Sequence, residues 1–227
     1  EDMEENRRRL ARLHEMMGDL GFGWNKGADW RGGVVDALDP AMQGRVAEWR
    51  KSGLNIMMSE KSEAKPVSFL EDCAVELKDL AEYTDKLTAI FDRNGVKGTW
   101  YAHASVGCLH VRPVLNMKQA GGAETMRAIA EEAFELVRSF GGSHSGEHGD
   151  GIVRSEFNDR MFGPVLPDLF RQVKAMFDSQ GMFNPGKITD APKMDERELF
   201  RFAPGYEAED FDSVLDWAAW PGAAGGF

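Results

Sequence analysis

Hydrophobic positions recur with helical spacing in several stretches of the chain. Within residues 4–17, apolar residues return every three or four positions among charged ones, which predicts an amphipathic helix. Asp39-Pro40 is typical of a capping residue before a proline at the first helical position, so a second helix is expected to run toward Ser59. Both predicted helices precede a richer pattern that starts at Pro66.

Beyond Pro66 the period of the apolar residues switches between that of strands and that of helices. Six elements are predicted, in the order strand, helix, strand, strand, helix, strand, at residues 67–70, 77–93, 96–103, 108–115, 123–140 and near Ser143. This order is that of the ferredoxin-like split motif. The expected fold class is therefore α+β, with a ferredoxin-like βαββαβ antiparallel sheet, both helices on one face of it, and flanking helices.

One more helix is expected at residues 166–177, with Leu169, Phe170, Val173 and Met176 facing inward. We expect three segments in all: a helical segment at 1–62, the ferredoxin-like domain at 63–190, and an extension toward a missing domain at 191–227. Its last residues, 220–227, have the composition of a linker. The chain is accordingly expected to be a piece of a longer polypeptide.

The charge balance limits the kinds of partner. There are 27 Lys and Arg against 38 Asp and Glu, a net charge of −11, which argues against nucleic acid or an anionic membrane. Apolar runs fall far short of the ~20 residues that span a bilayer, and the first residues do not match a secretory signal. The only two cysteines, Cys73 and Cys108, are expected to be reduced and buried. We expect a cytoplasmic protein without a transmembrane segment.

Four of the five histidines lie between positions 103 and 148, and two of them, His103 and His110, are seven positions apart. On one straight strand their imidazoles would face opposite sides, and on a helix they would lie about 10 Å apart along the axis. If residues 105–107 form a turn between two strands, both rings can converge, as a shared metal would require. Two unrelated strand-end histidines are the alternative.

A glycine-rich segment follows, Ser143-His-Ser-Gly-Glu-His-Gly-Asp-Gly151. Glycines weaken regular elements by about 0.5–1 kcal/mol each, and they suit a loop whose backbone closely approaches another group. Glu147 and His148 lie between two of them, so a carboxylate and an imidazole can act as ligand and proton acceptor. A plain surface turn is the alternative. The match to the His-x-x-Glu-His motif of zinc peptidases is weak, because that motif needs a helix.

A third candidate is the turn Phe183-Asn-Pro-Gly-Lys187. Proline followed by glycine favours a tight turn. Lys187 either projects a cation toward a cofactor or is simply solvated. By itself this motif does not distinguish the two.

Together these motifs resemble the C-terminal domain of the FAD-linked oxidases, a family that includes D-lactate dehydrogenases, the flavin subunit of glycolate oxidase and D-2-hydroxyglutarate dehydrogenases. The His-x6-His pair, the loop at 146–151 and the closing Asn-Pro-Gly-Lys occur in the family's order, within about residues 49–188. In that family a separate N-terminal domain holds most of the FAD, and this domain covers the flavin ring. The resemblance implies oxidation of a 2-hydroxy acid to a 2-oxo acid, with hydride transfer to the flavin.

Carried over residue by residue, the resemblance implies His103, His110 and Glu147 as ligands of a divalent metal. His148 is implied as the base that takes the proton from the 2-hydroxyl. Two histidines and one glutamate leave open positions for the hydroxyl and carboxylate of the acid. Zinc is the expected ion, and manganese or iron suits the same donors. Asn184 and Lys187 of the closing motif are expected to bind the cofactor.

The chain departs from many relatives in two places. It has Ser105-Val-Gly-Cys108 where many have Gly-Asp-Gly-Asn, and Arg112 where some have asparagine. Arg112, and Arg50 in a stretch resembling the family's substrate-binding helix, are expected to clamp substrate carboxylates. Two clamps suit a dicarboxylate such as D-2-hydroxyglutarate, with D-lactate as the other candidate. A surface ion pair is the alternative for each arginine.

Residues 202–220 resemble the connection in large fused members whose next domain carries iron–sulfur clusters. We therefore expect flavin-binding and iron–sulfur domains outside this chain, a location at the periphery of the inner membrane if the electron acceptor lies there, and no activity of the chain alone. No Gly-x-Gly-x-x-Gly fingerprint is present to hold FAD tightly. Two other functions stay open: a metal-dependent hydrolase that uses His103, His110 and Glu147, and a non-catalytic binding module.

Overall fold

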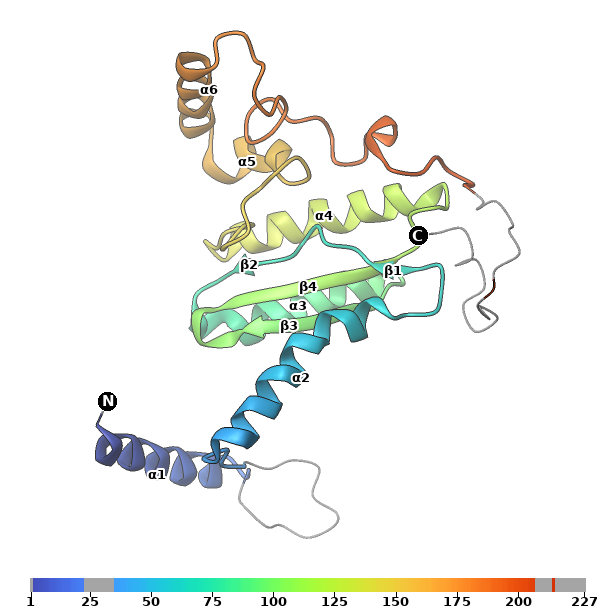
Figure 1. Ribbon diagram of the computed structural model, residues 1–227. Coiled ribbons are helices and arrows are strands. Elements are labelled where there is room, and N and C mark those ends of the chain that lie inside the picture. The colour runs from blue at the N-terminus through green and yellow to red at the C-terminus, as the bar shows by residue number, and fades with distance from the viewer. Residues whose placement is uncertain (1, 23–34, 207–213, 215–227) are drawn as a thin grey trace. The chain divides into compact units, whose positions relative to one another are not determined.

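The computed structural model describes residues 2–22, 35–206 and 214, and the chain forms two compact units, Glu1–Leu54 and Asn55–Phe227 (Figure 1). The first unit contains α1 (Met3–Asp19) and most of α2 (Pro40–Met58). Asp2 caps α1, where its carboxylate accepts the backbone N–H of Glu4 at 2.9 Å, and Asp39 accepts that of Met42 at 2.8 Å. Both predicted N-terminal helices are confirmed.

The second unit is built on an antiparallel sheet whose central strand is β4 (Cys108–Leu115). β3 (Gly98–His103) pairs along one edge of β4. Two short pieces, β1 (Lys65–Pro66) and β2 (Cys73–Ala74), pair along the other edge. Ala74 in turn forms an antiparallel bridge to Ser143, so the expected last strand is reduced to a single bridge. Across the sheet the strand segments therefore follow the order Ser143, then β1 and β2, then β4, then β3, which is the order that the split motif requires. The α+β fold is confirmed.

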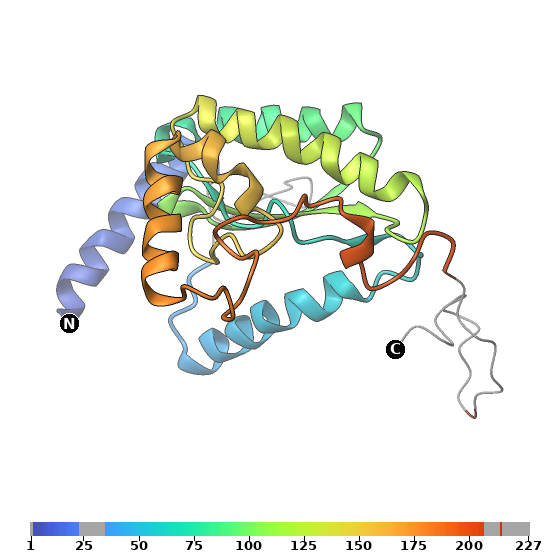
Figure 2. The same cartoon turned by 90° about the horizontal axis from the view of Figure 1, so that it is seen from above.

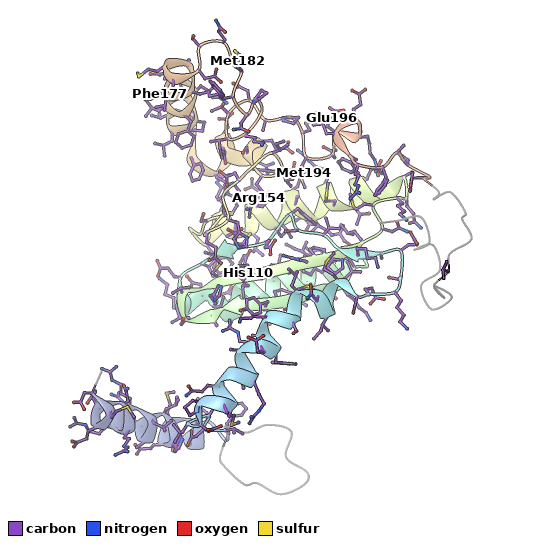
Figure 3. The ribbon with its side chains drawn as sticks, viewed as in Figure 1. His110, Arg154, Phe177, Met182, Met194 and Glu196 are labelled. Atoms are coloured by element: carbon purple, nitrogen blue, oxygen red, sulfur yellow. The ribbon has the colours of Figure 1, made fainter. Side chains whose placement is uncertain are left out.

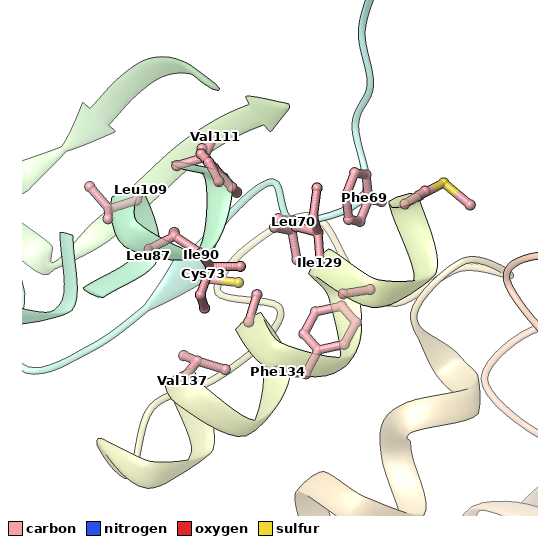
Figure 4. Close-up of a cluster of buried hydrophobic side chains, with 14 of the residues drawn as sticks. Phe69, Leu70, Cys73, Leu87, Ile90, Leu109, Val111, Ile129, Phe134 and Val137 are labelled. Atoms are coloured by element: carbon pink, nitrogen blue, oxygen red, sulfur yellow. The ribbon is translucent and has the colours of Figure 1, made fainter. Parts of the chain in front are cut away.

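The two long helices of the motif, α3 (Leu80–Arg93) and α4 (Gly121–Ser139), lie side by side on one face of the sheet (Figure 2). Each buries an apolar stripe that recurs every three or four residues, while β4 buries alternate residues toward the same layer (Figure 4). The side chains of this core include Leu70, Tyr83, Leu87, Ile90, Leu109, Val111, Ile129, Phe134 and Val137. The face of β3 and β4 that points away from these helices is left for the site.

The expected strand at 67–70 is wrong. Strand pairing occurs on either side of this segment, at β1 and β2, whereas Phe69 and Leu70 are buried in the core without belonging to a strand. A short apolar run looks the same in sequence whether it is buried by strand pairing or by side-chain packing. The backbone turns at Asp72, whose φ is 69°.

The expectation for α6 (Val165–Phe177) is right about the helix and wrong about three of its four inward residues, since only Phe170 is half-buried. The helix follows a short one, α5 (Asn158–Phe162). Leu169, Val173 and Met176 are 46%, 55% and 76% exposed, and Phe177 and Met182 beyond them are also exposed (Figure 3). Helical periodicity identifies an apolar face but not what covers it.

Both cysteines are free and buried, as expected. No helix within the described residues is long and apolar enough to cross a membrane. The predicted division at residues 62 and 190, and the cytoplasmic location, stay predictions. Most of the segment at 202–220, which was expected to lead to a further domain, lies outside the described residues.

Candidate functional site

The hairpin of β3 and β4 brings His103 and His110 onto one face of the sheet. A short 3-10 turn, Ala104–Val106, and Gly107 connect the strands, and the register pairs His103 with Cys108 and Tyr101 with His110. Cross-strand partners share a face, and so do residues two apart on one strand, which makes the two histidines diagonal neighbours. The turn hypothesis is therefore confirmed. Residues seven positions apart face opposite sides of a single strand. The turn between β3 and β4 instead places His103 and His110 on the same side of the hairpin.

Gly107 allows this turn for two reasons. Its φ is +69°, and a Cβ atom there would lie 1.9 Å from the carbonyl oxygen of Val75. The carbonyl of Gly107 also accepts the backbone N–H of Val75 at 3.1 Å. The chain consequently approaches the neighbouring segment more closely than any other residue type permits.

Glu147 reaches the two histidines from the glycine-rich loop. Its Oε1 atom lies 2.8 Å from Nε2 of His110 and 3.8 Å from Nε2 of His103, and the two rings meet edge to face with centroids 5.0 Å apart. Ligand atoms of these three residues all lie within 4.8 Å of one another. Two imidazoles and a carboxylate at this separation can converge on one metal ion. His110, labelled in Figure 3, marks the place on β4.

His148 completes the cluster. Its ring stacks on that of His110, with centroids 5.1 Å apart and an interplanar angle of 23°. The loop backbone lies close against the sheet edge here, because a Cβ on Gly146 would be 2.8 Å from the carbonyl oxygen of Asp72. The glycine-rich segment is thus a loop in close approach to other backbone, as its composition predicts.

Burial differs among the four residues. The side chains of His103, Glu147 and His148 are each more than two-fifths exposed, whereas that of His110 is only 10% exposed. Burial is the largest influence on His110 and lowers the pKa of its imidazole, although Glu147 acts in the opposite direction. Burial therefore favours the neutral imidazole, the form that binds a metal. Burial and the adjacent Glu147 carboxylate raise the pKa of the Cys108 thiol to about 11.

Arg112 lies beside this cluster and is paired with Glu71. Its Nη2 and Nε atoms are 2.5 Å and 3.2 Å from Glu71 Oε1, and both side chains are largely buried. Burial raises the pKa of Glu71, but hydrogen bonds from Ser68 and Arg112 outweigh it, and the pKa is lowered overall. Ligand atoms of Glu71, His110 and His148 also lie within 4.8 Å of one another. Arg112 follows His110 by two positions on β4, and its partner Glu71 lies next to the imidazoles of His110 and His148.

The remaining predicted site residues are Arg50, Asn184 and Lys187. Arg50 belongs to the first unit, and its role stays a prediction. Asn184 and Lys187 are exposed and contact each other, with Lys187 Nζ 3.2 Å from Asn184 Oδ1. Their turn is tied to the end of the glycine-rich loop, because the N–H of Ile188 points to Gly151 O at 3.4 Å. Their role toward a cofactor stays a prediction.

Sequence reasoning missed Glu71, Asp72 and Arg154. Asp72 is fully buried beneath the glycine-rich loop and is paired with Arg154, which is also buried. One signal was available in the sequence: two adjacent acidic residues inside the apolar stretch Phe69-Leu-Glu-Asp-Cys73. Acidic residues enclosed by core residues require partners, but the sequence does not say that Arg154 is one of them.

A family model described as "FAD linked oxidases, C-terminal domain" matches residues 1–188. The chain belongs to this family. The resemblance drawn from the His-x6-His pair, the glycine-rich loop and the closing turn is thereby confirmed. The matched residues include both N-terminal helices, α1 and α2.

Curated proteins similar to the chain include D-2-hydroxyglutarate dehydrogenases and D-lactate dehydrogenases. The chain is 36% identical over 163 residues to a D-2-hydroxyglutarate dehydrogenase of Pantoea ananatis, covering 70% of this chain and 16% of that protein. It is 36% identical over 155 residues to one of Escherichia coli, covering 66% and 15%. A D-lactate dehydrogenase of Archaeoglobus fulgidus is 30% identical over 132 residues, covering 58% and 29%.

The chain spans about a sixth of the length of the D-2-hydroxyglutarate dehydrogenases it matches. The hydrolase alternative draws no support from these relatives.

Proposed function

We propose that this FAD-linked oxidase domain binds the substrate and a divalent metal in an FAD-dependent 2-hydroxy acid dehydrogenase of the D-2-hydroxyglutarate or D-lactate type. One observation carries the proposal: donor atoms of His103, His110 and Glu147 lie within 4.8 Å of one another, beside the imidazole of His148. The reaction is oxidation of the 2-hydroxyl to a 2-oxo group. The similarity to D-2-hydroxyglutarate and D-lactate dehydrogenases supports this substrate class.

The donor set fits a divalent metal. His103, His110 and Glu147 are the proposed ligands, with zinc as the ion and manganese or iron as ions that suit the same donors. His103 and Glu147 are partly exposed, so the coordination positions of the metal that the protein leaves open would face solvent. Oxygen atoms of the substrate can bind there. A bound divalent ion acts as a Lewis acid and lowers the pKa of a hydroxyl it polarises.

His148 is the proposed base. Its ring stacks on His110 while nearly half of its side chain is exposed, so a substrate at the open side of the cluster is within its reach. A neutral imidazole accepts the hydroxyl proton. FAD, when bound, supplies the acceptor for the hydride from C2 of the substrate.

Arg112 is the proposed clamp for a substrate carboxylate. A guanidinium has five N–H donors, and the pair with Glu71 involves only those on Nε and Nη2. The remaining donors suit a second carboxylate, and Glu71 holds the group in place. Arg50 is the proposed second clamp, which would favour a dicarboxylate such as D-2-hydroxyglutarate.

The proposed partners are a flavin-binding domain and an iron–sulfur domain of a longer polypeptide. Two observations support further domains: the relatives are about six times longer than the matched region, and α6 exposes an apolar face through Leu169, Val173 and Met176. Asn184 and Lys187 are proposed to contact the cofactor from their exposed turn.

The first experiment is elemental analysis of the chain purified without chelator, alongside a Glu147→Ala, His110→Ala double variant. We expect close to one equivalent of zinc, manganese or iron in the natural sequence and none in the double variant. His14→Ala is the matched control, because it removes a histidine of the first unit and should leave the metal in place. Equal metal content in the natural chain and the double variant would refute the ligand set.

The second experiment tests the base in the longer natural polypeptide that carries the flavin. His148→Gln should lower kcat for D-2-hydroxyglutarate or D-lactate about 10²–10⁴-fold, while metal and flavin contents stay unchanged. Wild-type kcat in this variant would remove His148 from the reaction and leave the metal site to be judged by the first experiment.

A further inference from the structure

A buried ion pair lies beneath the loop that carries Glu147 and His148. Asp72 is fully buried and Arg154 is 7% exposed, and Nη1 of Arg154 donates to Asp72 Oδ1. Figure 3 labels Arg154 on the segment between α4 and α5. Two opposite charges at this depth need partners for all their polar atoms, so their other contacts indicate what the pair holds.

The other carboxylate oxygen of Asp72 is directed at the site loop. Oδ2 accepts the backbone N–H of Glu147 at 2.8 Å and that of His148 at 2.6 Å. It also lies 3.4 Å from the hydroxyl of Ser145, and the backbone carbonyl of Asp72 accepts the N–H of Gly146 at 2.8 Å. Asp72 alone therefore binds four consecutive residues of the loop.

Arg154 ties the same loop at its two ends. Its Nη1 donates to the carbonyl oxygens of Glu71 and, at 3.2 Å, of His144, while Nη2 donates to that of Gly149. The carbonyls of His144 and Gly149 directly precede and follow the segment that Asp72 holds. The pair thus replaces the regular hydrogen bonds that a glycine-rich loop does not form by itself.

We propose that Asp72 and Arg154 are positioning residues, which hold the backbone of Glu147 and His148 so that the Glu147 carboxylate meets His110 and the His148 ring stacks on it. What the positioned groups then do rests on the proposed function. An aspartate accepts two adjacent N–H groups with one oxygen while the other oxygen receives Arg154. An asparagine loses the charge that Arg154 requires and places an amide at one of these two positions.

Burial and the groups around Asp72 act in opposite directions on the pKa of its carboxyl group. Burial raises the pKa of Asp72, but the N–H groups of His148 and Glu147 and the guanidinium of Arg154 outweigh burial and lower it overall. The carboxylate is therefore ionised at neutral pH, the state in which its hydrogen bonds are strongest.

The test compares Asp72→Asn, and the double variant Asp72→Asn, Arg154→Met, with Glu156→Gln in the 227-residue chain. The double variant removes both charges, so no unpaired arginine is left to unfold the protein. Glu156→Gln is the matched control, because it breaks a partly buried pair with Arg127, at 2.6 Å, elsewhere in the same unit. For each variant we would measure the fraction folded, the zinc dissociation constant by competition, and hydrogen exchange of the Glu147 and His148 amides.

We expect both Asp72 variants to weaken zinc binding about 10–100-fold at equal folded fraction, as changes in groups that orient metal ligands do. The amides of Glu147 and His148 should exchange faster, and Glu156→Gln should leave both readouts unchanged. Unchanged amide exchange, or zinc affinity that falls no further than in the control, would overturn the proposal. If the natural chain binds no zinc, the elemental analysis decides the metal proposal, and amide exchange alone decides whether the pair positions the loop.

Discussion

Replacing Gly107 with alanine tests the hairpin that unites the two histidines. Gly107 has a φ of +69°, and a Cβ there would lie 1.9 Å from the carbonyl oxygen of Val75 and 3.1 Å from its carbon. A left-handed conformation costs a residue with a Cβ about 1–2 kcal/mol. Relieving the contact requires a backbone shift, and overpacking costs about 1–3 kcal/mol. The free energy of unfolding should therefore fall by about 2–5 kcal/mol.

Gly95→Ala is the matched control for this substitution. Gly95 has nearly the same φ, +65°, but no atom lies within 4 Å of the position its Cβ would take. It should lose only the conformational part, about 1–2 kcal/mol. The difference between the two variants measures the close approach of Gly107 to Val75, separately from the left-handed backbone.

Urea unfolding followed by circular dichroism gives the free energies, and variants with unchanged m values can be compared directly. Zinc affinity of the folded fraction is the second readout, because a shifted turn moves His103 away from His110. Equal destabilisation by Gly107→Ala and Gly95→Ala would refute the packing argument. Undiminished zinc affinity in Gly107→Ala would show that the turn does not set the separation of the histidines.

Three further predictions follow from particular side chains. The pKa of Asp72 is lowered in the folded state, so its contribution to the free energy of unfolding is complete above its ordinary pKa and is lost as pH falls through the lower folded value. Acid should therefore destabilise the natural chain more steeply than the Asp72→Asn variant. Urea midpoints of the two proteins that run parallel from pH 7 to pH 2 would contradict this. The Cys108 thiol, with a pKa of about 11, should react slowly with iodoacetamide at pH 7 in the folded chain and rapidly in urea, as mass spectrometry would record. Equal rates in the folded and the urea-unfolded chain would show that the thiol is accessible. Because Leu169 and Val173 are exposed, Leu169→Ser with Val173→Ser should change the free energy of unfolding by less than about 1 kcal/mol, two surface substitutions together, and a larger loss would mean that α6 is packed.

Much of the fold follows from local patterns along the chain. The expected boundaries of β4 agree with the structure, and those of α3, β3 and α4 agree within a few residues. These elements combine a clear apolar period with glycines at their ends, and both signals depend only on neighbouring residues. The chemical types at the candidate site were also evident, because histidines and a glutamate beside glycines have few roles in a regular element.

Contacts between distant residues left no comparable signal. Phe69 and Leu70 match the pattern of a strand because burial by packing and burial by strand pairing select the same residue types. Asp72 and Arg154 are 82 positions apart, and nothing near either residue indicates the other. The exposed face of α6 is likewise a matter of what lies against it, which the helical period does not encode.

The histidines show where the division falls. Residue identities and the turn at 104–107 are local properties, and they narrowed the geometry to a hairpin. Whether His103 and His110 share a face depends on the register of β3 with β4, and whether Glu147 reaches them depends on the buried pair beneath its loop. Register and loop position come from many weak contacts between segments far apart in the chain, so they exist only once the whole sheet has assembled.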